Sequence, residues 1–385
     1  MAKGGSQWRP DRRAVVTLAA VALLSACKVI PKGPPEAPPP EPGPEALPTD
    51  TDRHRVALLV PMTGENGAVG QSIANAATMA LLDTNAQNLR VTTYDTTAGA
   101  AAAARKAITD GNGLILGPLL SEDIPAVAAV TRAAKVPVIS YSNDFTAASR
   151  DVFVMGSLPG QSIARTVGHA RSQGARTFGA LIPGGEYGQR ASAALLSEVR
   201  AQGGSLVASE SYDRSNTSIA SAARRLREKG GFDAVLIADS GRIAAQAAPA
   251  LRGPGSTATI LGTELWSGES IVMSTPALRG AWFSAVSDTR FRQFADSYRK
   301  RFGGQPYRIA TLGYDSVLLT LRVTRDWKPG TRFPMNALLA RDGFIGLDGP
   351  FRFNANGVIE RALEVREVRA GGVTVVSPAP SRFGN

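Results

Sequence analysis

Residues 56–81 read VALLVPMTGENGAVGQSIANAATMAL, and this stretch decides the fold class. Its first five residues form a continuous apolar run, which is typical of a β-strand buried on both faces of a sheet. A glycine-containing loop follows, and residues 70–84 predict an Ala-rich helix. The stretch therefore predicts a strand–loop–helix unit, from which α/β proteins with parallel sheets are built.

The same alternation continues along the chain. Further strands are predicted at 89–94, 113–117 and 136–140, and helices at 100–109 and from Ser121, a candidate N-cap residue. A second series predicts strands at 177–182, 205–208, 234–238 and 259–262, with helices at 190–202 and 218–229. Strands that alternate with helices of this length indicate right-handed crossovers and a parallel sheet.

The restart of the series suggests two α/β lobes. A five-residue echo, GQSIA at 70–74 and again at 160–164, is a weak sign of duplication because helix starts share their chemistry. Tyr314, Val317, Leu318 and Leu321 share a helical face that we expect to return to the first lobe, while 349–353 and 362–368 predict a terminal hairpin or sheet edge. The expected first lobe comprises 55–158 plus about 284–328, and the second comprises 159–283 plus about 329–385.

The first 26 residues have the pattern of a signal peptide. A basic start with Lys3, Arg9, Arg12 and Arg13 precedes a mostly apolar run at 14–26, too short to span a bilayer. The run ends in Leu24-Ser-Ala-Cys27, which resembles the bacterial lipobox, whose cysteine is lipidated and begins the mature protein. A signal cut elsewhere or an uncleaved anchor are the alternatives. Lipidation of Cys27 implies an exported protein tethered to a membrane.

A proline-rich linker is expected at 27–54. Nine prolines fall between residues 28 and 55, and proline favours extended polyproline II, so this segment could span up to ~90 Å. The residue after Cys27 is Lys28 rather than aspartate. In a two-membrane bacterium the lipoprotein sorting rule would then favour the outer membrane, and the protein would be periplasmic.

Composition and motifs argue against an enzyme. One cysteine and two histidines leave no multi-cysteine metal site, and His54, in the expected linker, and His169 are interpreted as surface or packing residues. The sequence has no G-x-S-x-G and no Walker A motif, and its S-x-x-K matches lack a K-T-G partner. The loop at 64–70 spaces its glycines as G-x-x-G-x-x-G and carries Glu65, which does not fit a dinucleotide site. We expect no catalytic residues, no cofactor and no metal.

The net charge of +11 does not indicate nucleic acid. Removing the signal peptide leaves +8, and the arginines of the remainder are scattered over helices at 224–227 and 290–301 without interleaved aromatic residues. We expect no nucleic-acid partner.

Four segments in order resemble the type I periplasmic binding proteins, the leucine-binding family. They are 56–81, LILGPLLSEDIPAVAAVTRAAKVPVISYSND at 114–144, GEYGQ at 185–189 and ILGTELW at 260–266. The resemblance implies an α/β fold of two doubly wound parallel-sheet lobes joined by a hinge. It also implies a small ligand held in a cleft between the lobes, at the carboxyl ends of the strands, and captured by hinge closure.

The resemblance also implies a set of ligand-binding residues. The hydroxyls of Ser121, Ser140 and Ser142 would hold a carboxylate, Tyr187 would supply an aromatic lid, and Glu264 and Asp239 would take an ammonium group. The chain departs from the family at Glu122 and Asp123, which place anions beside Ser121 and weaken a carboxylate site there.

Two functions follow from the resemblance. The first is a lipid-anchored receptor for an amino-acid-like solute, for transport with an ABC permease or for sensing. The alternative rests on GPLLSED, LRGAWFSA and GPFRFNANG, which are similar to lipoproteins that activate penicillin-binding proteins. These have the same fold and contact a peptidoglycan synthase, so the chain would then be a non-catalytic regulator of peptidoglycan synthesis.

Overall fold

The computed structural model describes residue 1 and residues 52–215, 217–253 and 255–383. The expected signal peptide, Cys27 and nearly all of the linker therefore lie outside the described residues. Within the described part of the chain, no helix combines the length and apolar character needed to cross a bilayer.

The first sheet has five parallel strands in the order β2-β1-β3-β4-β5. They are β1 (His54–Val60), β2 (Leu89–Asp95), β3 (Leu114–Leu116), β4 (Val138–Ser140) and β5 (Val152–Val154). Strand β1 includes His54, which the sequence analysis placed in the linker. His54 is only 4% exposed and its ring stacks on Trp327, with the ring centroids 4.1 Å apart. It is therefore a packing residue at the first position of β1.

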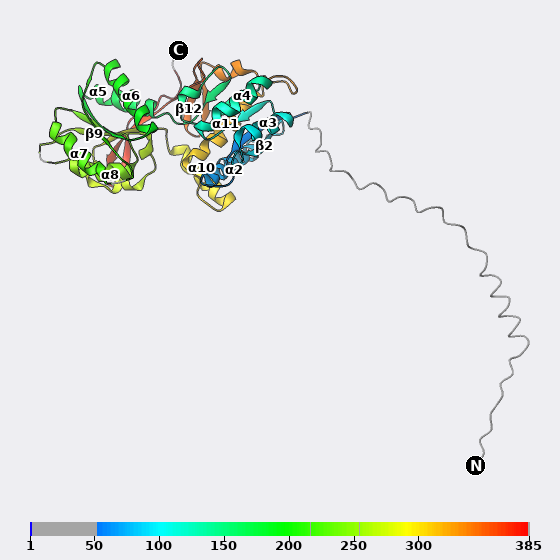
Figure 1. The fold of residues 1–385 in the computed structure, drawn as a ribbon, viewed down its shortest axis with the longest axis horizontal. Coiled ribbons are helices and arrows are strands. Elements are labelled where there is room, and N and C mark those ends of the chain that lie inside the picture. Colours follow the sequence, from blue (N-terminus) through cyan, green and yellow to red (C-terminus); the bar gives the residue numbers. More distant parts are fainter. Residues whose placement is uncertain (2–51, 216, 254, 384–385) are drawn as a thin grey trace, which may run out of the picture. The chain divides into compact units, whose positions relative to one another are not determined.

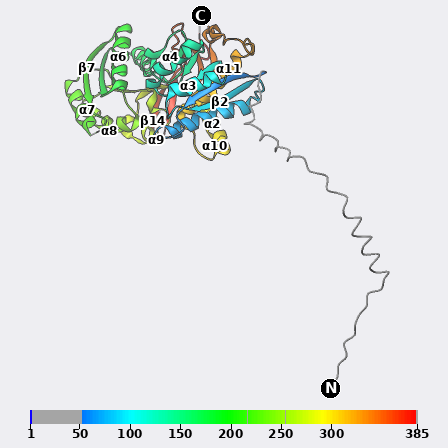
Figure 2. The ribbon, with the colours of Figure 1, turned by 45° about the vertical axis from the view of Figure 1, so that its right-hand side comes forward.

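Helices cover both faces of this sheet. Successive side chains of a strand point to opposite faces, and β1 divides in this way: Val56 and Leu58 pack in one core cluster, Ala57 and Leu59 in another. The first face meets α2 (Gly67–Asp83) and α11 (Thr311–Val323); the second meets α3 (Ala100–Thr109) and α4 (Ile124–Ala134). Figures 1 and 2 show these helices gathered around β2 and its neighbours.

The first lobe is completed by residues from the last quarter of the chain. Helix α10 (Thr289–Phe302) packs on α2, and α11 returns to the first lobe as expected. A three-stranded antiparallel sheet, β11 (Phe344–Gly346), β12 (Gly349–Phe353) and β13 (Ile359–Arg361), adds to the same core.

Residues from about 329 onward are expected in the second lobe, but several of them pack with the first. Phe333, Leu338, Phe351 and Ile359 belong to the core cluster of the first sheet. The segments 349–353 and 362–368, expected as one hairpin or edge, lie in two different sheets. Their strands are short and alternate in hydrophobicity, a pattern that reports a sheet but does not identify which core it covers.

The second sheet has seven strands in the order β15-β14-β10-β9-β8-β6-β7. They are β6 (Thr177–Pro183), β7 (Ser205–Tyr212), β8 (Ala234–Ile237), β9 (Thr259–Gly262), β10 (Trp282–Ala285), β14 (Glu364–Arg369) and β15 (Gly372–Ser377). The first five in chain order are parallel, and β14 and β15 are antiparallel to their neighbours.

Helices again cover both faces. One face meets α5 (Pro159–Ser172) and α6 (Glu186–Ala201), and the other meets α7 (Ser218–Lys229), α8 (Gly241–Leu251) and the short α9 (Ser270–Ser274). Most of these helices are green in Figure 1. The two doubly wound parallel-sheet lobes confirm the predicted fold class.

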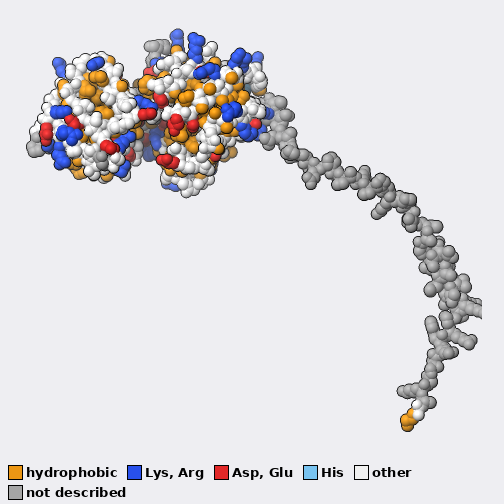
Figure 3. Space-filling model, viewed as in Figure 1, with side chains coloured by type: hydrophobic (Ala, Val, Ile, Leu, Met, Phe, Trp, Pro, Cys, Tyr) orange, Lys and Arg blue, Asp and Glu red, His pale blue; other side chains and the backbone are white. Residues whose placement is uncertain are grey.

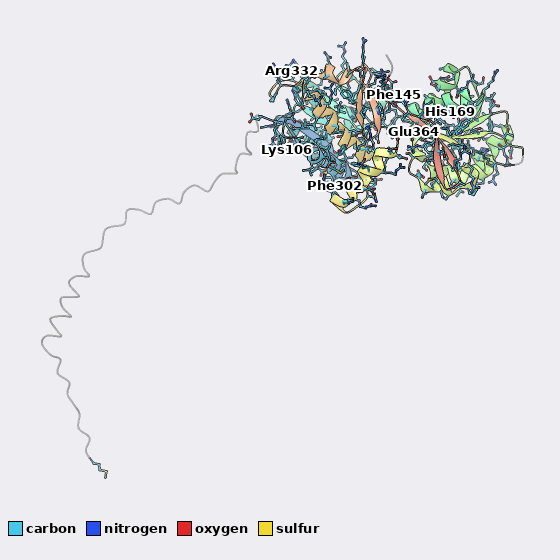
Figure 4. All side chains as sticks on the ribbon, turned by 180° about the vertical axis from the view of Figure 1, so that it is seen from behind. Lys106, Phe145, His169, Phe302, Arg332 and Glu364 are labelled. Carbon is cyan, nitrogen blue, oxygen red and sulfur yellow. The ribbon has the colours of Figure 1, made fainter. Side chains whose placement is uncertain are left out.

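The chain passes between the lobes three times. The crossings lie between β5 and α5, between β10 and α10, and between β13 and β14. Figure 4 labels Glu364, the first residue of β14, at the third of these crossings. Three passages of this kind form the hinge that the family resemblance implies.

Close helix–strand packing explains one glycine of the first loop. A Cβ at Gly70 would overlap the carbonyl oxygen of Pro61, just after β1, so α2 approaches the strand only because residue 70 has no side chain. Gly188 has the same relation to Pro183 at the end of β6. Gly160, the echo partner of Gly70, would meet only the Cβ of Ala194 at 3.5 Å. The two copies of GQSIA therefore lie in helices that pack differently within their lobes.

This difference predicts opposite effects of the same substitution. We expect Gly70→Ala to lower the free energy of unfolding by about 1–3 kcal/mol, as for an overpacked core. We expect Gly160→Ala to leave it unchanged or raise it by up to ~1 kcal/mol, because alanine favours the helix. Urea denaturation of the two variants measures both; equal destabilisation would contradict the packing account.

Candidate functional site

A cavity of about 580 Å³ is lined by both lobes and by the crossing segments. Its volume is in the range of about 300–1,000 Å³ that small-molecule sites occupy. Apolar side chains make up much of its wall: Val69, Leu119, Leu120, Leu158, Leu265, Val286, Ile309, Leu312 and Leu363. Such a wall suits a ligand with an apolar body, and orientation then depends on a few polar groups.

Two of the three predicted serines line the cavity. Ser121 opens a 3₁₀ turn (Ser121–Asp123) before α4, and Ser142 follows the end of β4. Ser140 does not line it: its buried hydroxyl donates to the carbonyl of Pro118 (3.0 Å) and accepts from the amide of Ser142 (3.1 Å). Ser140 thus fixes the backbone that presents Ser142.

The start of α4 is a poor place for an anion. Ser121 makes no capping hydrogen bond; its hydroxyl donates to the carboxylate of Glu122 at 3.4 Å. Glu122 itself lines the cavity. Burial, together with the charge of Glu122, raises the pKa of Asp123. Of the two acidic residues flagged in the sequence, Glu122 therefore places a carboxyl group on this side of the cavity, whereas Asp123 does not line it.

Glu264 is the polar group that the second lobe contributes. It begins a 3₁₀ turn (Glu264–Trp266) directly after β9, at the carboxyl end of the sheet. Its Oε1 lies 3.3 Å from the hydroxyl of Tyr187, and its Oε2 is buried with no hydrogen-bond partner in the described part of the chain. Burial raises the pKa of Glu264 to about 7. A cation or a hydrogen-bond donor from a ligand would offset the free-energy cost of burying this carboxylate.

Tyr187 and Asp239 lie behind the wall rather than in it. The Tyr187 hydroxyl is also 3.2 Å from the hydroxyl of Thr263, so the ring supports Glu264. The carboxylate of Asp239 accepts from the hydroxyl of Tyr212 at 2.6 Å and from Arg214 at 2.7 Å. Its oxygens are therefore already occupied by protein donors.

Three charged cavity residues were missed by the sequence analysis: Arg308, Asp348 and Arg361. Arg308 follows α10, Asp348 lies in the β11–β12 turn, and Arg361 ends β13. A signal for Arg361 was present, because the strand alternation places it on the same buried face as Ile359. No local pattern distinguishes Arg308 or Asp348 from solvated loop residues.

A polar contact joins the lobes beside the cavity. Arg190, on α6, lies 3.5 Å from the carboxylate of Asp144 and donates to the side chain of Asn143 at 3.3 Å. Both partners belong to the loop after β4, and Asn143 lines the cavity. The side chains of Arg190 and Asp144 are each 19% exposed. The pair therefore stabilises the arrangement of lobes seen here.

Other chemistry is sparse in the described residues. They hold no group of three histidine, cysteine or carboxylate side chains that could bind a metal. His169 packs edge-on against Trp282, with ring centroids 4.8 Å apart. On the face shown in Figure 3, lysine and arginine side chains are spread over both lobes and interspersed with acidic ones.

Two doubly wound lobes around a small-molecule cavity define a two-lobed α/β binding protein. The chain belongs to the periplasmic binding protein family, whose model matches residues 54–373. It is a type I member of that family, and the family places it in the periplasm.

Solved structures share this fold. A protein from Rhodospirillum rubrum, assigned to a branched-chain amino acid ABC transporter, superposes with a TM-score of 0.75 at 21% identity over 84% of this chain and 100% of its own. A branched-chain amino acid substrate-binding protein from Streptococcus pneumoniae, solved with isoleucine, gives 0.60 at 21% identity over 85% and 100%.

One curated relative is an uncharacterised protein of Rickettsia prowazekii. It is 27% identical over 173 residues, which cover 44% of this chain. The match spans 46% of that relative's length, less than half of it.

The burial of Glu264 predicts a pH dependence of stability. Its folded-state pKa of about 7 exceeds the ordinary 4.5, so the folded chain keeps a proton that the unfolded chain releases, and stability falls as pH rises between these values. We expect Glu264→Gln to be about 1–2 kcal/mol more stable than the wild type at pH 8 and less dependent on pH. Urea unfolding at pH 5 and pH 8 measures this.

Glu210→Gln is the control. Its side chain, on the same lobe, is 13% exposed, but ion pairs with Lys229 and Arg225 lower its pKa, so this variant should gain no stability at pH 8. Equal behaviour of the two variants would refute a role for burial of Glu264.

Proposed function

We propose that the protein is a lipid-anchored periplasmic receptor that captures a small, amino-acid-like solute in the interlobe cavity for transport or sensing. The observation that carries this proposal is the cavity itself. An apolar wall surrounds a buried carboxyl group, Glu264, one of whose oxygens lacks a partner in the described part of the chain. An ammonium group is the ligand chemistry that suits such an oxygen.

The lining supports a ligand with both polar and apolar parts. Leu158, Ile309 and Leu312 would contact an aliphatic body, while Ser142 and Glu264 offer hydrogen-bonding groups. The relative from Streptococcus pneumoniae that was solved with isoleucine carries the same fold. Branched-chain amino acids are therefore the first ligands to test.

Non-catalytic capture fits the residues that line the cavity. No histidine or cysteine is among the described residues that line it, the Ser121 hydroxyl has only a long 3.4 Å contact with the carboxylate of Glu122, and the Ser142 hydroxyl accepts from the backbone amide of Asp144. Binding and hinge closure are then the whole activity. For transport, the closed form would deliver its ligand to an ABC permease.

The anchor is the second part of the proposal. Lipidation of Cys27 and a proline-rich segment would hold the binding unit near a membrane, and Lys28 favours the outer one. An outer-membrane position suits the alternative function, regulation of a peptidoglycan synthase, better than delivery to an inner-membrane permease. The two functions differ in whether the cavity takes a ligand.

A ligand screen separates them. We expect leucine or isoleucine to raise the midpoint of thermal unfolding of the wild-type chain, since a ligand that binds only the folded state stabilises it. Glu264→Gln should weaken binding roughly 10- to 100-fold through loss of a charged hydrogen bond. Glu210→Gln, with an isosteric change away from the cavity, should bind as the wild type does.

Native mass spectrometry of the same samples gives the stoichiometry directly. A cavity that takes no small molecule, in a chain that co-purifies with a peptidoglycan synthase, would refute capture and support the regulator.

The anchor has its own test. We expect Cys27→Ser to move the protein from the membrane fraction to the soluble fraction, because the thiol is the only attachment point for lipid in the chain. Fractionation with immunodetection measures this, and Ser25→Ala, which keeps the cysteine, is the control. A variant that stays in the membrane fraction would contradict lipidation at Cys27.

A further inference from the structure

Arg361 carries a buried guanidinium with few hydrogen-bond partners among the described residues. The residue is 7% exposed; among the described residues its guanidinium makes one hydrogen bond, from Nη2 to the carbonyl of Met155 at 2.8 Å, and lies 5.5 Å from the centre of the Phe351 ring. Its Nε and Nη1 are buried without a hydrogen-bond partner among the residues that the structure describes. Arg361 also lines the cavity. A permanently charged group is costly to bury in this state unless an anion meets it.

The carboxyl groups of Asp348 and Asp315 favour the charged guanidinium electrostatically, but neither accepts a hydrogen bond from it. Asp348 forms its ion pair with Arg308, at 2.8 Å, and accepts from the hydroxyl of Thr311. Asp315 accepts from the amide of Leu347, and burial raises the pKa of its carboxyl group, which favours the neutral form. Within the described chain, Arg361 takes part in no ion pair with either carboxylate.

Helix α5 adds positive potential at the same place. Its first turn lines the cavity through Leu158, Gln161 and Ser162, and no side chain caps it. Pro159 has no amide hydrogen and the amide of Gln161 donates to the carbonyl of Leu158 at 3.1 Å, so the contribution of this turn is the partial positive charge of the helix start. The side chain of Gln161 joins this turn to Arg361, because its carbonyl oxygen accepts from the Arg361 amide at 3.1 Å.

We infer that Arg361, with the first turn of α5, receives the carboxylate of the ligand. The inference rests on the proposed function and specifies how the ligand lies. Its carboxylate would meet the third crossing segment rather than the start of α4, where the carboxyl group of Glu122 lines the cavity. The Nε or Nη1 of Arg361, each without a hydrogen-bond partner among the described residues, can donate a charge-assisted hydrogen bond to a carboxylate. The ligand class is then a small carboxylate with an apolar body.

A purely structural role makes a different prediction for the empty protein. If Arg361 serves only to hydrogen-bond Met155 to β13, Arg361→Met should destabilise the chain as much as removal of another buried arginine that makes hydrogen bonds. Arg165 gives that comparison, since it does not line the cavity and donates to the backbone carbonyl of Leu363 and to the hydroxyl of Ser377. If instead the unpartnered Nε and Nη1 make the buried guanidinium costly, Arg361→Met should be less destabilising than Arg165→Met, or stabilising.

The decisive experiment compares acids with their amides. Binding of leucine, isoleucine and benzoate, and of leucinamide, isoleucinamide and benzamide, is measured by calorimetry on the full chain. We expect the wild type to prefer acid over amide, and Arg361→Met to lose roughly 10- to 100-fold in affinity for the acid while changing little for the amide. Arg361→Lys should keep part of the preference because it keeps the charge. Arg165→Met should keep all of it.

The outcomes separate the two proposals. Acid binding that is unchanged in a folded Arg361→Met variant would overturn the assignment of Arg361 and leave solute capture standing. Equal wild-type affinity for acid and amide would do the same. If the wild type binds none of the six compounds, solute capture of this ligand class fails and the assignment of Arg361 fails with it.

Discussion

Both sheets must be covered on both faces, and the rest of the architecture follows from this constraint. The strands of each sheet are buried from two sides, so each needs two layers of helices. In the first lobe, one layer is built from α2, together with α10 and α11, which come from much later in the chain. The chain must therefore leave the first lobe, build the second and return, and must then cross again to reach β14. These crossings also bring residues such as Arg361 to the cavity wall.

The parts of the fold that sequence could predict are those with local signals. The continuous apolar run at 56–60 predicts a strand, and the Ala-rich segment after it predicts a helix. The repetition of this unit predicts a parallel sheet. The return of α11 followed from its amphipathic face. The segment around Phe333 and Phe351 was harder to assign to a lobe, because short alternating strands carry no information about which of two cores they cover. His54 was hidden by the proline-rich sequence before it, since its partner Trp327 is far away in the chain.

The candidate site divides in the same way. Residues at strand ends could be chosen from the family resemblance, and Ser121, Ser142 and Glu264 do line the cavity. Tyr187 was expected as a lid, but its hydroxyl faces Glu264. The roles of Ser140 and Asp239 depend on hydrogen bonds to particular neighbours, which sequence alone does not give. The place of Arg361 in the cavity could be assigned only once the topology was known. It ends β13 at the third crossing between the lobes, where a charged side chain reaches the cavity.

The late arrival of α11 and of β11–β13 has a consequence for biogenesis. Until residue 359 has been synthesised, one face of the first sheet lacks Val317, Leu338, Phe351 and the other partners of its core. The N-terminal third of the nascent chain is therefore unable to reach its native state while synthesis continues, and its pairings have a long sequence separation. A first lobe that only these late segments complete cannot acquire its full native stability before nearly the whole chain has been made.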